Sequence, residues 1–276
     1  MSYEVVRTRA GHLAMRCRQT GEIMHPGVGP LAEAEALYVQ QSRLGERLAE
    51  ATPAPLVLFD VGLGAGSNAV AARSAAQRAP SPDARLEIVS FENDLGALAL
   101  ALEHGPAFGL TGEHAEAAGA LLSRGNHDGQ RVAWRLEHGD LLARLEELQA
   151  GTTRADVMFW DPFSRRANPT LWTVRAFATA RSLARPGCML FTYSASTATR
   201  VALLLAGWAV GAGDATGSKA ETTAAAVNLA DLARPLQPGW LTRLSRPHGD
   251  VPLPPDAPPD FAAAIAGLPQ FALANG

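Results

Sequence analysis

Two short segments of the sequence hold residue types that could carry out chemistry. Residues 60–68, Asp-Val-Gly-Leu-Gly-Ala-Gly-Ser-Asn, place a carboxylate before three closely spaced glycines. Glycine lets the backbone approach a bound nucleotide-like ligand. Residues 159–164, Phe-Trp-Asp-Pro-Phe-Ser, end an apolar run with a carboxylate, a rigid proline and an aromatic ring. We expect both segments to lie at one ligand site.

The glycines Gly62, Gly64 and Gly66 stand between an apolar run and an alanine-rich helical pattern, and Asn68 follows them as a further ligand-binding candidate. Ser67 occupies the place of the third glycine of Gly-x-Gly-x-x-Gly, so the segment departs from the dinucleotide fingerprint. A carboxylate at Asp60 could pair with a cationic amino group, which S-adenosylmethionine (SAM) has and a dinucleotide pyrophosphate lacks. A tight strand-to-helix turn without a ligand is the alternative.

Two further carboxylates follow the next two expected strands. Glu92 could accept hydrogen bonds from both hydroxyls of a ribose, as acidic residues do at this position of nucleotide-binding folds. Asp140, in Glu-His-Gly-Asp, could meet an adenine amino group. As a helix N-cap Asp140 would give the same sequence pattern, so both interpretations stay open. A solvated surface carboxylate is the alternative for Glu92.

The segment Asp161-Pro162-Phe163 is the strongest candidate for catalysis. A methyl group on a sulfonium needs little activation, so a methyltransferase mainly aligns the nucleophile and removes its surplus proton. Asp161 could accept a hydrogen bond from an amine, Pro162 would fix the turn, and Phe163 could stack on a planar base. An Asp-Pro turn with a core phenylalanine is the structural alternative.

Other candidates carry weaker signals. Trp172 is expected in the core or beside the pocket, and His25 in a Pro-Gly turn could touch the substrate. The histidines and acids show no metal-ligand spacing, so no metal site is expected. No Gly-x-Ser-x-Gly elbow is present, which argues against a serine hydrolase.

Apolar runs alternate with helix-patterned stretches from residue 56 onward, which is typical of βα units and a parallel sheet. The expected strands are 56–61, 86–91, 132–136, 155–160, 189–193, 208–210 and 222–227. The expected helices are 67–79, 94–104, 113–123, one after Asp140, 171–184 and 195–205. Together they predict an α/β fold with a doubly wound, mostly parallel, seven-stranded sheet that binds ligands at the carboxyl ends of its strands.

The predicted organisation has three parts. Residues 1–55 form an N-terminal segment, with a helix at 31–49, that covers the substrate side. Residues 56–228 form the SAM-binding methyltransferase domain. Residues 229–276 hold nine of the 19 prolines, so we expect an extended tail apart from an amphipathic stretch near 261–268.

Composition and cysteine placement exclude several classes. With 47% hydrophobic and 18% charged residues, the 276-residue chain is too apolar to be disordered, and it has no apolar run of about 18 residues that could cross a membrane. Cys17 and Cys188 stand too far apart for a metal cluster and form no secretory disulfide framework. The N-terminal residues show no targeting pattern. We therefore expect a cytoplasmic protein, and the sequence does not specify an oligomeric state.

Charge distribution bears on the partner. The formal net charge is −3, yet residues 154–200 hold seven arginines against two acids. This local excess makes a phosphate-bearing substrate possible. Genomic codon bias is the plainer explanation, because 23 of the 24 basic residues are arginine.

Four segments together resemble the methyltransferase domain of MnmC-type tRNA-modifying enzymes. They are residues 60–68, 160–172 (Trp-Asp-Pro-Phe-Ser-Arg-Arg-Ala-Asn-Pro-Thr-Leu-Trp), 186–195 (Pro-Gly-Cys-Met-Leu-Phe-Thr-Tyr-Ser-Ala) and 217–222 (Gly-Ser-Lys-Ala-Glu-Thr). The resemblance implies a Rossmann-like class I methyltransferase that uses SAM and methylates the aminomethyl group on the wobble uridine of tRNA. It also implies SAM contacts at Asp60, Gly62, Gly64, Glu92 and Asp140, and places Asp161 beside the amine.

Two positions depart from the family pattern. Asp60 stands where the family usually has glutamate, and Pro162 stands where it has glycine. The second change moves residues 161–163 toward the Asp-Pro-x-aromatic pattern of other amino-methyltransferases. The alternatives are therefore methylation of a small-molecule or other nucleic-acid amine, an NAD(P)-dependent oxidoreductase, and a non-catalytic SAM- or RNA-binding module.

Overall fold

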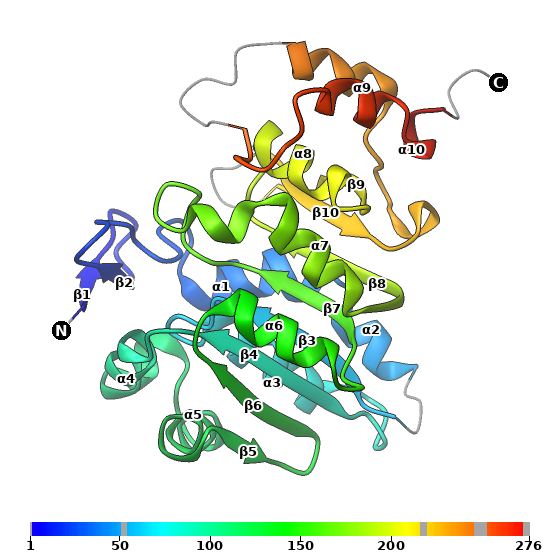
Figure 1. Ribbon diagram of the computed structural model, residues 1–276. Coiled ribbons are helices and arrows are strands. Elements are labelled where there is room, and N and C mark those ends of the chain that lie inside the picture. The colour runs from blue at the N-terminus through cyan, green and yellow to red at the C-terminus, as the bar shows by residue number, and fades with distance from the viewer. Residues whose placement is uncertain (1, 51–53, 216–219, 246–252, 273–276) are drawn as a thin grey trace.

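An eight-stranded sheet lies between two layers of helices in the computed structural model, which describes residues 2–50, 54–215, 220–245 and 253–272 (Figure 1). The strand order is β5-β6-β4-β3-β7-β8-β10-β9. The strands are β3 (Leu56–Val61), β4 (Leu86–Glu92), β5 (Asn126–Asp128), β6 (Val132–His138), β7 (Ala155–Trp160), β8 (Ala184–Thr192), β9 (Ala209–Gly213) and β10 (Thr222–Ala226).

The five central strands, β6, β4, β3, β7 and β8, are parallel, and β5 and β10 pair antiparallel with their neighbours. The doubly wound, mostly parallel arrangement predicted from the sequence is confirmed. The expected number of strands was wrong by one, because β5 is a short polar edge strand. Its Asn-His-Asp sequence has no apolar alternation, and it pairs antiparallel with β6.

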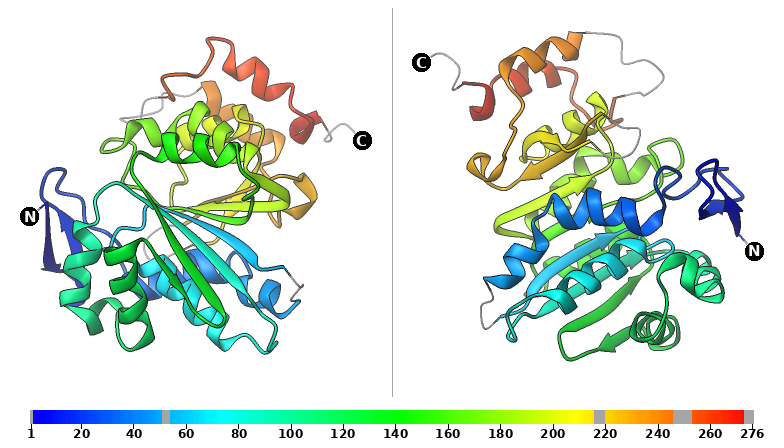
Figure 2. Two further views of the ribbon diagram at one scale, coloured as in Figure 1. Left: turned by 60° about the horizontal axis from the view of Figure 1, so that its bottom comes forward. Right: turned by 180° about the vertical axis from the view of Figure 1, so that it is seen from behind.

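Helices cover both faces of the sheet, and Figure 2 shows the two layers from further directions. Those before β6 in the chain are α1 (Pro30–Ala34), the π-helical turn η1 (Glu35–Gln40), α2 (Leu44–Ala49), α3 (Ser67–Arg78), α4 (Gly96–Glu103), the 3-10 turn η2 (Gly105–Phe108) and α5 (Glu113–Arg124). Those after β6 are α6 (Leu141–Gln149), the 3-10 turn η3 (Pro169–Trp172), α7 (Val174–Ser182) and α8 (Thr197–Leu205). Side chains of Asp140, Thr173 and Ser196 cap α6, α7 and α8 by accepting a backbone N–H bond. Each face of the sheet has its own apolar core.

The N-terminal segment differs from the expected single long helix. It begins with a hairpin, β1 (Tyr3–Arg7) and β2 (Leu13–Cys17), which packs beside α4. The helical stretch is interrupted at Arg43, whose φ of 52° lies in the left-handed region and ends one helix before α2 starts. Periodicity does not reveal such a break, because the apolar spacing continues across it.

The C-terminal residues form more structure than the expected extended tail. They contain the 3-10 turns η4 (Leu229–Asp231) and η5 (Pro238–Ser245), and the helices α9 (Phe261–Ala266) and α10 (Pro269–Ala272). The predicted amphipathic stretch is confirmed as α9. Gln270 donates to the carbonyl of Val210 (2.6 Å) and accepts from its N–H (2.8 Å). The tail therefore covers edge strand β9, whose unpaired backbone groups would otherwise face solvent.

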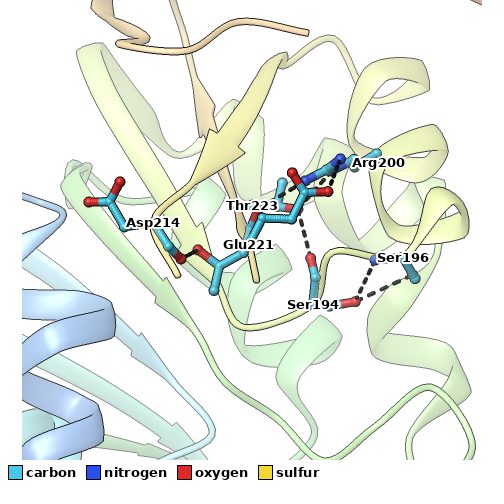
Figure 3. A network of polar contacts seen from close by, with 7 residues as sticks. Ser194, Ser196, Arg200, Asp214, Glu221 and Thr223 are labelled. Carbon is cyan, nitrogen blue, oxygen red and sulfur yellow. Dashed lines mark hydrogen bonds and ion pairs between the residues drawn. The ribbon is translucent and has the colours of Figure 1, made fainter. Parts of the chain in front are cut away.

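A buried arginine joins α8 to β10 near the carboxyl end of β8 (Figure 3). Arg200 is 1% exposed, donates to Thr223 Oγ1 (3.1 Å) and pairs with Glu221 (3.1 Å). Thr223 in turn donates to the carbonyl of Ser194 (2.7 Å). Of the resemblance segment 217–222, residues 217–219 lie outside the described residues. Within the described part of the chain, no helix is long and apolar enough to cross a membrane.

Candidate functional site

A cavity of about 690 Å³ opens at the carboxyl ends of β3, β4, β6 and β7. This is where parallel α/β sheets bind ligands. Seven of the ten site residues predicted from the sequence line it: Gly62, Gly64, Glu92, Asp140, Asp161, Pro162 and Phe163. Asp60, Gly66 and Asn68 are not among its lining residues. Residues 19–26 of the N-terminal segment form a further side of the cavity.

The glycine turn brings two loops into close contact. Gly62 has φ 86°, and a Cβ atom there would lie 2.8 Å from the carbonyl oxygen of Asp161. Gly64 has φ 52°, and a Cβ there would lie 3.0 Å from Met24 Sδ. Both positions therefore require glycine for conformation and for space. Gly66 has φ 84° and stands just before α3, behind the cavity surface.

The carboxylate of Glu92 holds the glycine turn from below. Its Oε2 accepts from the N–H of Gly64 (3.0 Å), and its Oε1 accepts from the N–H groups of Asn93 (2.8 Å) and Asp94 (3.1 Å). Burial raises the pKa of Glu92, while these hydrogen bonds oppose the rise. A carboxylate can accept about four hydrogen bonds, so Glu92 keeps capacity for a ligand hydroxyl.

Asp140 is confirmed as a helix N-cap, and its contact with a ligand stays a prediction. Its Oδ1 accepts from the N–H of Ala143 (3.1 Å), which makes it the N-cap of α6. The same residue lines the cavity. One oxygen can therefore cap the helix while the side chain stays within reach of a ligand.

Asp60 lies behind the cavity instead of facing it. It is 0% exposed, and its Oδ2 accepts from Ser90 Oγ (2.7 Å), which also accepts from Trp134 Nε1 (2.9 Å). The Oδ1 atom is buried without a hydrogen-bond partner among the described residues. Burial raises the pKa of Asp60 to about 7. Side chains alternate along a strand, which turns Asp60 into the layer beneath the glycine turn, so this geometry does not provide the direct pairing with a ligand amino group.

Asp161 sits at the end of β7, directly against the glycine turn. Its N–H donates to the carbonyl of Val61 (2.9 Å), and its Oδ2 accepts from Asn68 Nδ2 (2.8 Å). Asn68 thus holds the Asp161 carboxylate and does not line the cavity. Burial raises the pKa of Asp161, and the charge of His25 opposes this. The buried Tyr38 hydroxyl lies beside Asp161, and burial followed by the Asp161 charge raises the pKa of Tyr38.

The turn after Asp161 is fixed by side chains from other elements. Tyr193 Oη donates to the carbonyl of Pro162 (3.1 Å), and Trp172 Nε1 donates to the carbonyl of Phe163 (2.9 Å). The N–H of Ser164 donates to Glu22 Oε2 (3.0 Å), and its hydroxyl donates to Glu22 Oε1. Trp172 is fully buried, so it belongs to the core and also anchors this turn.

His25 is the site residue that sequence reasoning undervalued. Its Nε2 lies 3.6 Å from Asp161 Oδ2, and its Nδ1 lies 3.9 Å from Glu33 Oε1. It lines the cavity and adopts φ 50°. The turn residues Pro26 and Gly27 marked a loop, but nothing in that loop indicated its partner at the end of β7. Such a contact comes from the fold and cannot be read from local spacing.

The cavity is strongly acidic. Six carboxylates line it: Glu22, Glu33, Glu92, Asp94, Asp140 and Asp161. None of the described lining residues is Arg or Lys. The cavity therefore favours cationic ligands, since low-dielectric clefts of one charge sign concentrate ions of the other sign.

The arginine-rich stretch does not form one basic surface. Arg185 pairs with Asp156 (2.6 Å), Arg175 pairs with Glu146 (2.6 Å), and Arg200 is buried. Arg181 stacks over Trp208. Arg165 and Arg166 alone of the seven follow Asp161 in the same turn, so the local charge excess in the sequence is dispersed by the fold. Among the described residues no cluster of His, Cys, Asp and Glu could hold a metal ion.

Comparisons with known proteins agree with the fold. A family model described as S-adenosyl-L-methionine-dependent methyltransferase matches residues 115–228. The bifunctional protein MnmC of tRNA 5-methylaminomethyl-2-thiouridine biosynthesis from Methylibium petroleiphilum is 30% identical over 226 residues, which are 80% of this chain and 34% of that protein. The chain is an MnmC-like methyltransferase.

Further relatives support this family. The MnmC protein of Pseudomonas putida KT2440 is 31% identical over 221 residues, 77% of this chain and 33% of that protein. The crystal structure of MnmC2 from Aquifex aeolicus superposes with a TM-score of 0.66 at 26% identity, covering 82% of this chain and 70% of that one. This MnmC-like chain spans about a third of the length of the curated relatives it matches. The match to a SAM-dependent methyltransferase family argues against the NAD(P)-dependent oxidoreductase alternative.

The cavity fits SAM, the cofactor of this family. SAM carries a sulfonium and an amino group, and the carboxylates that line the cavity suit both cations. The glycine turn allows close approach of the backbone at Gly62 and Gly64. A volume of about 690 Å³ lies within the range of cofactor sites.

Proposed function

We propose that this methyltransferase modifies the amine of an aminomethyl group on the wobble uridine of tRNA, in the cytoplasm. The observation that carries the proposal is the carboxylate of Asp161, held by Asn68 at 2.8 Å and set against the glycine turn in an acidic cavity. A carboxylate in this position suits an amine, because an amine has N–H bonds to donate and arrives as a cation.

The residue roles follow from this geometry. Gly62, Gly64, Glu92 and Asp140 would contact the cofactor, while Asp60, Gly66 and Asn68 would support the two loops from behind. Pro162 would fix the turn, and Phe163 would stack on the base that carries the amine. The N-terminal residues 1–55 would cover the acceptor side of the domain 56–228, and residues 229–276 would protect its edge.

Bound SAM supplies a methyl group already activated by its sulfonium. The residues must therefore present a nitrogen lone pair in line with that methyl group. An alkylammonium has a pKa of about 10 and keeps its proton at neutral pH, so the acceptor enters the acidic cavity charged. Asp161 accepts a hydrogen bond from this nitrogen, takes up a proton and orients the neutral amine.

The test begins with calorimetric titration of SAM and its demethylated product, with NADH as a control. Micromolar binding of the product and none of NADH is expected. Methyl transfer is then measured on tRNA whose wobble uridine carries an aminomethyl group, and on the same tRNA with the unmodified uridine. Equal transfer to both tRNAs, or to neither, would reject the proposed acceptor.

A small-molecule amine is a second candidate acceptor, favoured by the dispersed arginines and the acidic cavity. Salt dependence distinguishes the two. Binding of tRNA should weaken steeply between about 50 and 200 mM salt, whereas that of a small amine should change little.

A further inference from the structure

His25 connects two carboxylates that come from distant parts of the chain. Asp161 follows β7, and Glu33 lies in the first turn of α1. The imidazole lies between them, with Nε2 3.6 Å from Asp161 Oδ2 and Nδ1 3.9 Å from Glu33 Oε1. Each ring nitrogen therefore has its own carboxylate.

The three side chains lie at the border between interior and solvent. Their exposed fractions are 12% for Asp161, 11% for His25 and 14% for Glu33. All three line the cavity. Both distances exceed a hydrogen bond of about 3 Å, and a small ring rotation or one water molecule would close each gap.

Carboxylates and tyrosines lie around His25 and its two partners. Among the described residues, the titratable groups that interact with it or its two partners are Asp161 at the end of β7, Glu33 on α1, Tyr38 on η1, Asp60 on β3 and Tyr193 after β8. A proton on the imidazole would thus be stabilised from several sides.

We propose that His25 is a positioning residue that relays the acceptor proton from Asp161 to Glu33 and so resets Asp161 for the neutral amine. The inference rests on the proposed function, since it needs an amine acceptor. The acceptor ammonium releases one proton to Asp161, and that proton passes to His25 Nε2 while the Nδ1 proton passes to Glu33. The freed lone pair then forms the new N–C bond as the S–C bond breaks, and the breaking bond's electron pair stays on sulfur.

The relay explains why a histidine occupies a strained backbone position. A φ of 50° is uncommon for residues other than glycine, although asparagine, aspartate and histidine tolerate it. Without a base to accept its proton, Asp161 would stay protonated after the first transfer and could not accept the N–H of the reactive amine. His25 passes this proton on to Glu33.

The activity test compares His25→Asn with the matched control His104→Asn, an exposed residue after α4. Asparagine tolerates the left-handed backbone but cannot relay the proton. We expect kcat/KM of His25→Asn to fall about 100-fold at pH 7. The deficit should shrink to about fivefold near pH 9.5, where solution supplies more neutral amine. A deficit that is the same at every pH would indicate a structural role and overturn the relay.

A second measurement needs no acceptor. In the product-bound enzyme, the imidazole titration of His25 is followed by NMR in the wild type, Asp161→Asn and Glu33→Gln. Each variant should lower the pKa of His25 by at least about half a unit, while His104 stays unchanged. An unaltered His25 titration in both variants would overturn the relay, whatever the acceptor. If the wild type does not methylate tRNA but the pKa of His25 falls in both variants, the tRNA acceptor is overturned and the relay is retained.

Discussion

The two sides of the cavity are built by different means. The glycine side, residues 62–65, 92–94 and 139–140, consists largely of backbone and of carboxylates that bond to nearby backbone N–H groups. The aspartate side, residues 161–164, is held by side chains of Glu22, Asn68, Trp172 and Tyr193 from four other parts of the chain.

This difference determines which substitutions each side of the cavity tolerates. A backbone-built surface depends on conformation at a few glycines and tolerates few substitutions. A surface held by side chains from separate elements can be altered one contact at a time. We therefore expect mutations on the aspartate side to change acceptor use while cofactor binding persists.

The largest effect is expected from Asp161→Asn. The variant keeps the shape of the side chain and, with its amide oxygen toward Asn68, keeps that hydrogen bond, but it loses the proton acceptor. We expect kcat/KM to fall about 1,000-fold, within the range for loss of a general base. Titration of the demethylated product should give an unchanged Kd. Asp128→Asn, on the exposed strand β5, serves as the control. A parallel loss of product affinity would show that the two sides do not separate.

The sequence predicted the residues at the strand ends better than those of the N-terminal segment. Gly62, Glu92 and Asp140 were found because each stands at or just after the end of a strand, and the carboxyl ends of parallel strands meet at one edge. Asp161 was found by the same argument. His25 and Glu22 lie in an N-terminal segment whose hairpin and position over the cavity depend on long-range packing, which periodicity does not report.

The pH dependence of stability tests the layer beneath the glycine side. Burial raises the folded-state pKa of Asp60 to about 7, whereas an unfolded aspartate titrates near 4. The folded protein therefore keeps a proton that the unfolded chain has released, and the free energy of unfolding falls as pH rises from about 4 to 7. This contribution should be on the order of 3 kcal/mol.

Urea unfolding of the wild type and of Asp60→Asn at pH 5 and pH 8 measures this contribution of Asp60 to the free energy of unfolding. The wild type should be less stable at pH 8, and the asparagine variant should lack most of that difference. Equal pH dependence in both proteins would mean that Asp60 is not the group that titrates.

Gly62→Ala tests the contact between the glycine turn and the backbone of Asp161. Its control is Gly187→Ala, because Gly187 has a similar φ of 79° but nothing within 4 Å of the added Cβ. The control should cost about 1 kcal/mol of stability for the backbone alone. Gly62→Ala should cost about 2 kcal/mol more, because the new methyl group meets the Asp161 carbonyl. Thermal unfolding gives both values, and equal losses would mean that the loops can separate at no cost.

Residues whose roles changed between sequence and structure illustrate a general limit. Asp60 and Asn68 were assigned to the cofactor because they border the glycines in the sequence. Asp60 instead bonds to Ser90 on the neighbouring strand, and Asn68, in the first turn of α3, donates to Asp161. Sequence proximity locates a motif, but the direction of each side chain depends on strand alternation and on partners far along the chain.

The smallest effect is expected at the contact between Ser164 and Glu22, which ties the N-terminal segment to the aspartate side. Ser164→Ala removes the hydroxyl donor and leaves the backbone N–H bonded to Glu22 Oε2 (3.0 Å). Loss of one hydrogen bond to a charged group is worth roughly 1–2 kcal/mol.

If residues 19–26 form part of the acceptor site, the KM for the acceptor should rise about fivefold, in line with that loss, while kcat and product affinity stay within about twofold. Ser164→Thr should restore the KM, and Ser123→Ala, a surface position on α5, should have no effect. A rise in the Kd for the product, with no change in the KM for the acceptor, would mean that the N-terminal segment contacts the cofactor. Met24, which lies against Gly64, would then make the N-terminal segment part of the glycine side of the cavity.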